Sequence, residues 1–146
     1  MEEVLTQFRE FLHERSLRAT DVREGILKAI LARGGHFDID ELVRDVREQG
    51  LEASRATVYR ALPLFKEAGI IQSTIRSGDR RCYENTVGQE HHDHLFCTSC
   101  GKIVDFQFEA FEMLQREVAS KHGFNLTGHS HELYGICREC QAGSRQ

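Results

Sequence analysis

Two Cys-x-x-Cys pairs, Cys97 with Cys100 and Cys137 with Cys140, constrain the fold of this chain more than any other feature. A tight turn brings the two sulfur atoms of such a pair to one side, and four thiolates in a tetrahedron suit Zn²⁺ with no open coordination position. The 36 residues between Cys100 and Cys137 exceed the usual spacing of a zinc ribbon. We therefore expect a structural zinc ion that joins the two ends of a small domain.

Redox chemistry and unligated core cysteines are the alternatives for these four residues. Gly101 directly follows Cys100, as in a zinc knuckle, and the surrounding pattern lacks the βαβ context of a thioredoxin-like redox motif. Both observations favour zinc. The fifth cysteine, Cys82, stands alone in a strand-like run, and we expect it to be a small buried residue.

A histidine-rich segment, residues 90–94, precedes the first cysteine pair. In an extended segment His92 and His94 point to one face, and His91 and Asp93 to the other. One strand can therefore contribute to two metal sites. Five or six imidazole and carboxylate ligands suit Fe²⁺ or Mn²⁺, although Zn²⁺ and Cu²⁺ can bind more tightly. Candidates for the remaining ligands are His36, Glu84, Asp105, Glu112, His122, His129 and His131.

A solvated polar loop is the alternative reading of residues 90–94. For any single outlying histidine or acid, an ordinary surface role is the default expectation. His131 in particular is expected to be an exposed strand residue.

The first half of the chain has helical periodicity. A capping box at Asp38 and Glu41 and an N-cap at Ser54 mark two of the helix starts. Pro63 removes the backbone hydrogen bond to the carbonyl of Tyr59 and predicts a bend. The predicted helices cover residues 3–14, 21–33, 39–49 and 55–68.

A hairpin is predicted next, with strands at residues 70–75 and 81–84 around Ser77-Gly78-Asp79. Helices followed by a hairpin are the order of a winged helix-turn-helix. After residue 90 we expect a helix at 109–122, with Phe111, Leu114 and Val118 inward, and strands at 95–97, 103–106, 124–126 and 132–136.

The predicted fold class is α+β, with an N-terminal winged helix-turn-helix domain and a small C-terminal α/β domain. The expected boundaries are a winged-helix domain at 1–84, a polar connector at 85–89 and a metal-binding domain at 90–146. No apolar run reaches 18 residues and the N-terminus is acidic, so we expect a cytoplasmic protein without a membrane partner.

The formal net charge of −4 argues against nucleic acid, but the charge is uneven. Residues 1–82 contain 14 basic and 14 acidic residues, whereas residues 83–146 contain 5 and 9, and residues 55–81 have a local charge of +4. The helix that follows Ser54 can enter a major groove and offers Arg55, Thr57, Tyr59 and Arg60 to bases or phosphates. A solvated amphipathic helix is the alternative, and the basic hairpin favours DNA.

These motifs together resemble the ferric uptake regulator (Fur) family of metal-dependent repressors, which also has peroxide-sensing and zinc-sensing branches. The resemblance extends from about Leu17 to Cys140. It rests on the ordered occurrence of Ala56-Thr57-Val58-Tyr59-Arg60, His91-His92-Asp93-His94-Leu95, Cys97-x-x-Cys100-Gly101-Lys102, Lys121-His122-Gly123-Phe124, and His129 followed by Leu133-Tyr134-Gly135 and Cys137.

The resemblance implies a homodimer that binds A·T-rich palindromic double-stranded DNA operators and no small organic substrate. It implies that residues 1–84 are the DNA-binding domain, residues 85–89 the hinge, and residues 90–146 the α/β dimerisation domain. It implies three metal sites: Cys97, Cys100, Cys137 and Cys140 for structural zinc; His36, Glu84, His92, His94 and Asp105 for a regulatory Fe²⁺ or Mn²⁺ at the hinge; and His91, Asp93, Glu112 and His129 for a second site. It also places Tyr59 and Arg60 in the major groove and Arg18 in the minor groove.

Iron sensing is the preferred branch because a glutamate at position 84 is similar to the acid of the iron-sensing branch. Asp105 is more typical of the peroxide sensors, and zinc sensing is a third possibility. From other functional classes, a metallohydrolase would need an open metal position and a general base, and a storage or redox protein would leave the basic helix unexplained.

Overall fold

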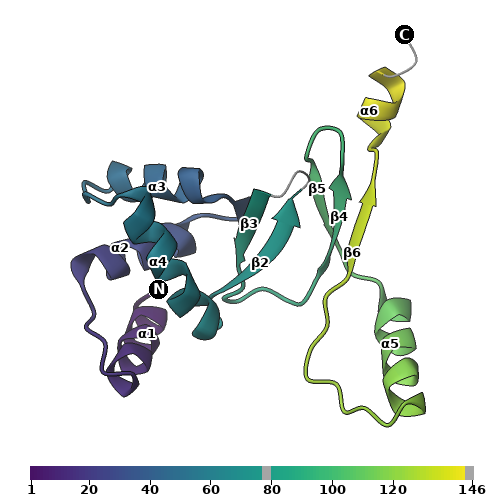
Figure 1. Cartoon of the computed structure of the whole chain (residues 1–146), viewed down its shortest axis with the longest axis horizontal. Coiled ribbons are helices and arrows are strands. Elements are labelled where there is room, and N and C mark those ends of the chain that lie inside the picture. Colours follow the sequence, from purple (N-terminus) through teal and green to yellow (C-terminus); the bar gives the residue numbers. More distant parts are fainter. Residues whose placement is uncertain (77–79, 144–146) are drawn as a thin grey trace. The chain divides into compact units, whose positions relative to one another are not determined.

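The computed structural model describes residues 1–76 and 80–143, and the side chains of 74–76 and 80 are excluded from the description. The predicted turn at Ser77-Gly78-Asp79 and the basic side chains of Arg76 and Arg80 lie outside the described residues. Within the described part, residues 1–75 and 80–89 form one compact unit, and residues 90–143 form the other (Figure 1).

The first unit contains helices α1 (Glu2–Glu14), α2 (Asp21–Ala32), α3 (Ile39–Glu48) and α4 (Arg55–Glu67). Side chains cap three of them: Thr20 caps α2, Ser54 caps α4, and Asp38 forms the predicted capping box with Glu41. These contacts satisfy backbone N–H groups that have no partner inside the helix. The helices bury one apolar core, in which the rings of Phe8 and Phe65 stack with centroids 4.8 Å apart.

A small sheet completes this unit, with β1 (His36–Phe37), β2 (Ile71–Arg76) and β3 (Arg80–Asn85) in the order β1-β3-β2. The neighbouring strands β2 and β3 confirm the predicted strand pair, and helices with this sheet make a winged helix. Strand β1 was not predicted because two residues are too short for a periodic pattern. Cys82 in β3 is buried as expected, and its thiol donates to the carbonyl of Phe37.

The connector 85–89 is hydrogen-bonded to the first unit. The Thr86 N–H donates to the carbonyl of Ile70 over 2.9 Å, and the Thr86 hydroxyl donates to the carbonyl of Gly69 over 2.7 Å. Val87 packs against the core of the helices. This part of the expected hinge is therefore anchored at its N-terminal side.

The second unit contains β4 (Asp93–Cys97), β5 (Ile103–Phe106), α5 (Glu109–Lys121), β6 (Glu132–Gly135) and α6 (Arg138–Gly143). Its sheet has the order β5-β4-β6, in which β4 pairs antiparallel with β5 and parallel with β6. The strand predicted at 124–126 is wrong: these residues form no strand, and Phe124 is 73% exposed. Helix α6 was not predicted.

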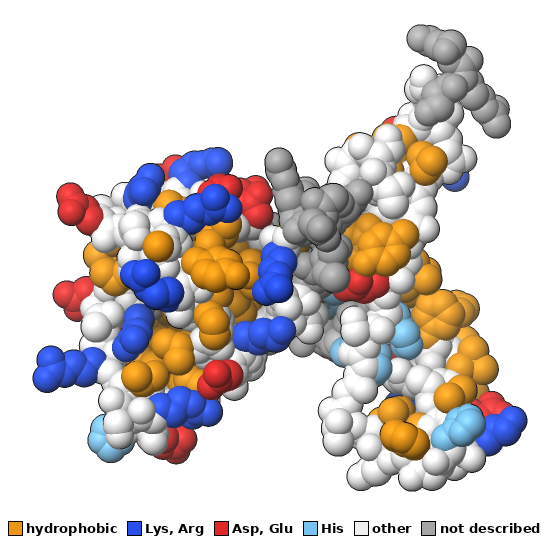
Figure 2. Space-filling model, in the orientation of Figure 1, with side chains coloured by type: hydrophobic (Ala, Val, Ile, Leu, Met, Phe, Trp, Pro, Cys, Tyr) orange, Lys and Arg blue, Asp and Glu red, His pale blue; other side chains and the backbone are white. Residues whose placement is uncertain are grey.

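The apolar core of the second unit is thin. Within its described residues, the buried apolar side chains are Phe96, Cys97 and Ala119. The prediction that Leu114 and Val118 point inward is wrong for the single chain, because they are 56% and 58% exposed, whereas Phe111 is half-buried. In Figure 2 apolar side chains are visible along this unit. Among the described helices, none is long and apolar enough to cross a membrane.

Candidate metal centres and nucleic-acid interface

The sheet of the second unit gathers the four cysteines. Parallel pairing aligns Cys97 at the end of β4 with Gly135 at the end of β6, so the turn after β4 and the start of α6 lie together. The Sγ atoms of Cys97 and Cys140 are 3.9 Å apart, and those of Cys100 and Cys137 are 3.7 Å apart. A tetrahedron with Zn–S bonds of about 2.3 Å has edges of about 3.8 Å. These two distances therefore match the edges of a zinc tetrahedron, and all four sulfur atoms lie within 4.8 Å of one another.

Backbone geometry prepares one of these thiols, that of Cys97, for a metal. The Cys137 N–H donates to the Cys97 sulfur over 3.2 Å, and with the N–H of Cys100 it lowers the pKa of the Cys97 thiol to about 6. Gly101 has φ +75°, a left-handed conformation that closes the turn after Cys100 with a bond from its N–H to the Cys97 carbonyl. The lowered pKa favours the Cys97 thiolate, which is the metal-binding form, whereas the neighbouring thiols and burial raise the pKa values of Cys100 and Cys137.

One face of β4 carries a triad of donors, His92, His94 and Asp105. Strand pairing puts His94 opposite Asp105, and His92 lies two residues before His94 on the same face. The Nε2 atoms of His92 and His94 are each 3.9 Å from an Asp105 carboxylate oxygen. His94 is 5% exposed at its side chain. We refer to these residues as the His92–His94–Asp105 triad.

The first unit supplies a separate pair of donors, His36 and Glu84. They are directly opposite each other in the β1–β3 ladder, and the His36 Nε2 atom is 3.0 Å from a Glu84 oxygen. Gln72 of β2 donates to the other oxygen of Glu84. We refer to these two residues as the His36–Glu84 pair.

The opposite face of β4 gathers the residues of the predicted second site. The His129 Nε2 atom is 3.0 Å from Glu112 and 4.0 Å from Asp93, and the His91 Nδ1 atom is 3.9 Å from Glu112. Asp93 Oδ1 is buried and has no hydrogen-bond partner, and the buried His129 Nε2 atom is close to carboxylate oxygens without a hydrogen bond of good geometry. Buried polar atoms are rarely left without a hydrogen bond, and a bound cation explains both observations. This donor set fits a divalent metal.

His131 was among the candidate ligands, but the expectation that it is an exposed strand residue is wrong. It is half-buried rather than exposed and precedes β6 instead of lying in a strand, and its Nδ1 atom is 3.2 Å from Asp93 Oδ2. Its position two residues after His129 was the available signal, because residues two apart in an extended segment share a face. His122, another candidate, is exposed at the C-terminus of α5 and belongs to no donor group among the described residues.

Helix α4 presents the residues predicted to contact DNA. Arg55, Tyr59 and Arg60 are exposed, and the Arg55 guanidinium is held by Asp40 over 3.1 Å. Thr57 is half-buried, and its hydroxyl is 2.8 Å from that of Ser54, so this side chain takes part in the helix cap. Arg18 is exposed in the segment between α1 and α2.

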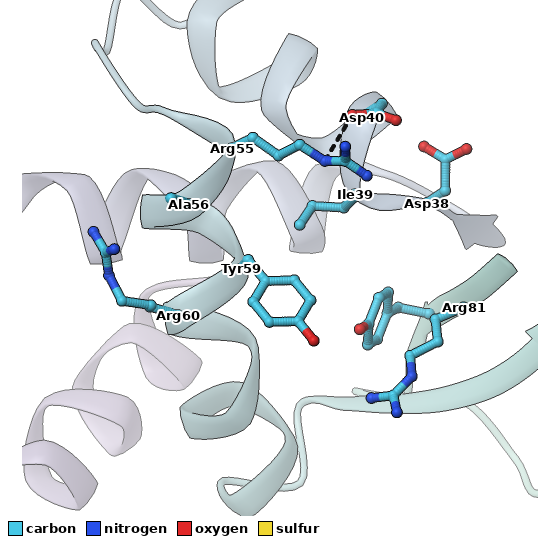
Figure 3. Close-up of a pocket in the computed structure, with 9 residues that line it drawn as sticks. Asp38, Ile39, Asp40, Arg55, Ala56, Tyr59, Arg60 and Arg81 are labelled. Atoms are coloured by element: carbon cyan, nitrogen blue, oxygen red, sulfur yellow. Dashed lines mark ion pairs between the residues drawn. The ribbon is translucent and has the colours of Figure 1, made fainter.

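A pocket of about 950 Å³ lies between α4, the start of α3 and β3 (Figure 3). Tyr59 projects from α4 toward it, and Arg81 approaches from β3. In Figure 2 several Lys and Arg side chains are visible over the first unit. A helix with exposed basic and aromatic residues beside a basic strand can contact both the bases and the phosphates of DNA.

Comparison with known proteins gives consistent matches over most of the chain. A sequence profile described as "Ferric uptake regulator family" matches residues 14–134. The ferric uptake regulation protein of Campylobacter jejuni is 36% identical over 139 residues, which cover 94% of this chain and 88% of that protein.

Solved structures match as well. The ferric uptake regulator of Helicobacter pylori, described as having three functional metal binding sites, aligns with a TM-score of 0.84 and 30% identity over 96% of this chain and 93% of that one. A zinc uptake regulator complexed with zinc and DNA aligns with a TM-score of 0.60 and 26% identity over 99% and 97%. These matches agree with the winged helix and α/β units described above.

Proposed function

Because the chain belongs to the ferric uptake regulator family of metal-dependent transcriptional repressors, we propose that it represses transcription from A·T-rich palindromic operators when its regulatory site holds Fe²⁺ or Mn²⁺. It is a regulator and not an enzyme. The observation that carries the proposal is the division of the regulatory donors: the His36–Glu84 pair belongs to the winged-helix unit, and the His92–His94–Asp105 triad belongs to the other unit.

This division supports a clasp. We assign residues 1–84 to DNA binding, 85–89 to a hinge and 90–146 to metal binding and dimerisation. When the pair and the triad contribute ligands to one ion, they hold the winged helix in one orientation toward the metal-binding domain. The ion supplies a positive charge to which carboxylate and imidazole ligands from both domains can coordinate. Selection of one orientation lets the two recognition helices of a dimer meet successive DNA half-sites.

The other two sites have separate roles. The four cysteines hold a structural zinc ion, since four thiolates leave no position open. His91, Asp93, Glu112 and His129 form a second site, supported by the buried and otherwise unsatisfied atoms of Asp93 and His129. The three sites parallel the three functional metal binding sites of the Helicobacter pylori protein.

The DNA contacts follow from the exposed residues of the first unit. Tyr59 and Arg60 face the major groove from α4, Arg55 contacts bases or phosphates, and Thr57 shapes the helix start through the Ser54 cap. Arg18 enters an A·T-rich minor groove, where the potential attracts guanidinium groups. The related zinc uptake regulator in complex with DNA supports double-stranded DNA as the partner. The site of action is the cytoplasm.

A homodimer explains the exposed apolar residues of the second unit. Leu95, Val104 and Leu133 on the sheet and Leu114 and Val118 on α5 are each at least 40% exposed. A chain with this much open apolar surface gains stability by covering it with a second copy.

The proposal is tested by gel-shift assays on an A·T-rich palindrome with zinc-loaded protein. We expect a shifted complex with Fe²⁺ or Mn²⁺ under anaerobic conditions and none after the regulatory metal is removed with a mild chelator. Binding that is independent of metal, or absent with every metal, would contradict a metal-dependent repressor.

Peroxide sensing is a second candidate, favoured by the shorter acid Asp105 within 3.9 Å of both histidines. Anaerobic iron-loaded protein is exposed to peroxide and analysed by mass spectrometry. Addition of an oxygen atom to His36 or His94, with loss of DNA binding, would assign the peroxide branch. Unmodified protein that stays bound to DNA would assign the iron branch.

A further inference from the structure

His131 is placed beside the second metal site by strand pairing. Its carbonyl accepts a hydrogen bond from the His94 N–H over 3.3 Å, and the parallel register pairs His94 with Glu132. One step back in this register, His131 lies next to Asp93. Neighbouring side chains on adjacent strands share a face of the sheet, so the imidazole of His131 and the carboxylate of Asp93 are adjacent.

The donor atoms lie close enough together to bind one ion. With bonds of about 2.1 Å, neighbouring ligand atoms on one ion are about 3.0–3.4 Å apart. His131 Nδ1 is 3.2 Å from Asp93 Oδ2, which is within this range, and Asp93 Oδ1 is 4.0 Å from His129 Nε2, which is longer. One donor atom from each of Asp93, His129 and His131 lies within 4.8 Å of the other two. His129 also belongs to the donor group with His91 and Glu112.

The surroundings hold the His131 ring in position. Phe111 of α5 contacts it edge to face, with ring centroids 5.5 Å apart, and the His129 ring centroid is 4.9 Å away. Asp93 is 4% exposed at its side chain, and its Oδ1 atom has no hydrogen-bond partner although Oδ2 contacts His131. The cluster therefore has an unsatisfied buried oxygen that a cation would complete.

We propose that His131 is a fifth ligand of the second metal site, which then has three imidazoles and two carboxylates. This rests on the second site of the proposed function, to which it adds a ligand. A third imidazole favours ions that prefer nitrogen donors, such as Zn²⁺ or Co²⁺, over Mn²⁺. The second site thus discriminates among divalent cations through a residue outside its four predicted ligands.

The competing role for His131 is to position the Asp93 carboxylate through a hydrogen bond, as residues behind metal ligands commonly do. Two substitutions separate the roles. His131→Asn keeps an N–H donor close to the position of Nδ1, whereas His131→Leu removes all polar contact with Asp93. If His131 is a metal ligand, both variants lose metal affinity. If His131 only positions the Asp93 carboxylate, only the leucine variant loses metal affinity.

The direct test is NMR of the histidine ring nitrogens in the full ¹⁵N-labelled chain, with structural zinc retained, during titration with Zn²⁺. We expect one His131 ring nitrogen to shift to the metal-bound range at the same equivalent of Zn²⁺ as His129. We also expect both variants to bind this Zn²⁺ ion at least about tenfold more weakly than the unaltered protein. His122→Leu is the control and should keep the affinity.

The outcomes separate this proposal from the function on which it rests. If His129 shifts and His131 does not, or if His131→Asn retains the affinity, the fifth ligand is wrong and the second site stands. If neither His91 nor His129 shifts in the unaltered protein, the second site itself is wrong, and the assignment of His131 falls with it.

Discussion

Single residues in β4 decide which metal site a donor can reach. Neighbouring side chains of a strand face opposite sides, so a shift of one residue would exchange the donors of the two faces. His94 faces Asp105 in the triad, and Asp93 faces His129 and His131.

At this scale we predict that His94→Ala keeps the fold and the structural zinc but abolishes metal-activated DNA binding. The triad loses one of its two imidazoles, while the four cysteines are untouched. Zinc content by elemental analysis and gel shift with Mn²⁺ test this, with His122→Ala as the control. Full activation of His94→Ala would remove His94 from the regulatory site.

The start of α3 is close in the chain to the regulatory His36–Glu84 pair, because its N-cap Asp38 directly follows β1 and lies two residues after His36. The Asp38 carboxylate accepts from the Glu41 N–H over 2.9 Å, and Glu41 accepts from the Asp38 N–H over 2.8 Å. These reciprocal bonds set where the strand ends and the helix begins.

We predict that Asp38→Ala lowers the free energy of unfolding by about 0.5–2 kcal/mol, the range for loss of an N-cap. Chemical denaturation followed by circular dichroism measures the change. Glu48→Ala, an exposed acid at the other end of α3, should leave stability nearly unchanged. Equal losses in the two variants would argue against the cap.

The ends of β4 and β6 depend on the cysteine cluster, since little apolar surface is buried nearby. We predict that Cys97→Ser loses zinc and unfolds residues 90–143, because metal binding to such a site contributes directly to the folding free energy. Zinc analysis and limited proteolysis test this. Cys82→Ala is the control, because Cys82 lies in β3 of the first unit and does not belong to the cluster. A Cys97→Ser protein that keeps its zinc and resists proteolysis would contradict the site.

For the whole molecule, the exposed face of α5 predicts self-association. We expect Val118→Glu to shift the protein from dimer to monomer, because a buried unpaired carboxylate at an interface is strongly unfavourable. Light scattering after size-exclusion chromatography gives the mass. Lys121→Glu introduces the same side chain at the last residue of the same helix and should leave the dimer intact. A dimeric Val118→Glu protein would exclude this face.

The clasp also predicts reciprocal coupling between metal and DNA. If the regulatory metal tightens operator binding by some factor, operator DNA must tighten metal binding by the same factor. Titration of Mn²⁺ with and without the palindrome, by calorimetry, measures this. A scrambled duplex is the control, and equal Mn²⁺ affinity with and without the operator would contradict the clasp.

Many of the secondary-structure elements and the grouping of the donor residues follow from local sequence patterns. Caps and helical periodicity predicted the four N-terminal helices because such signals act within a few residues. The alternation in residues 91–94 separated the donors of two sites for the same reason. Errors arose where local patterns carry little information: β1 is two residues long, and the apolar segment 124–126 is exposed instead of paired in a strand.

The sequence by itself therefore predicted helices α1 to α5, the grouping of the four cysteines and the two faces of β4, since spacing along the chain is enough to define them. Only the tertiary structure decided how the sheet brings Cys97 to Cys140, which residues stand beside Asp93, and that α5 leaves apolar residues uncovered. Those features depend on strand register and on which apolar surface stays exposed after the chain has packed. Neither is encoded in any short segment, because both result from pairing between residues far apart in the chain.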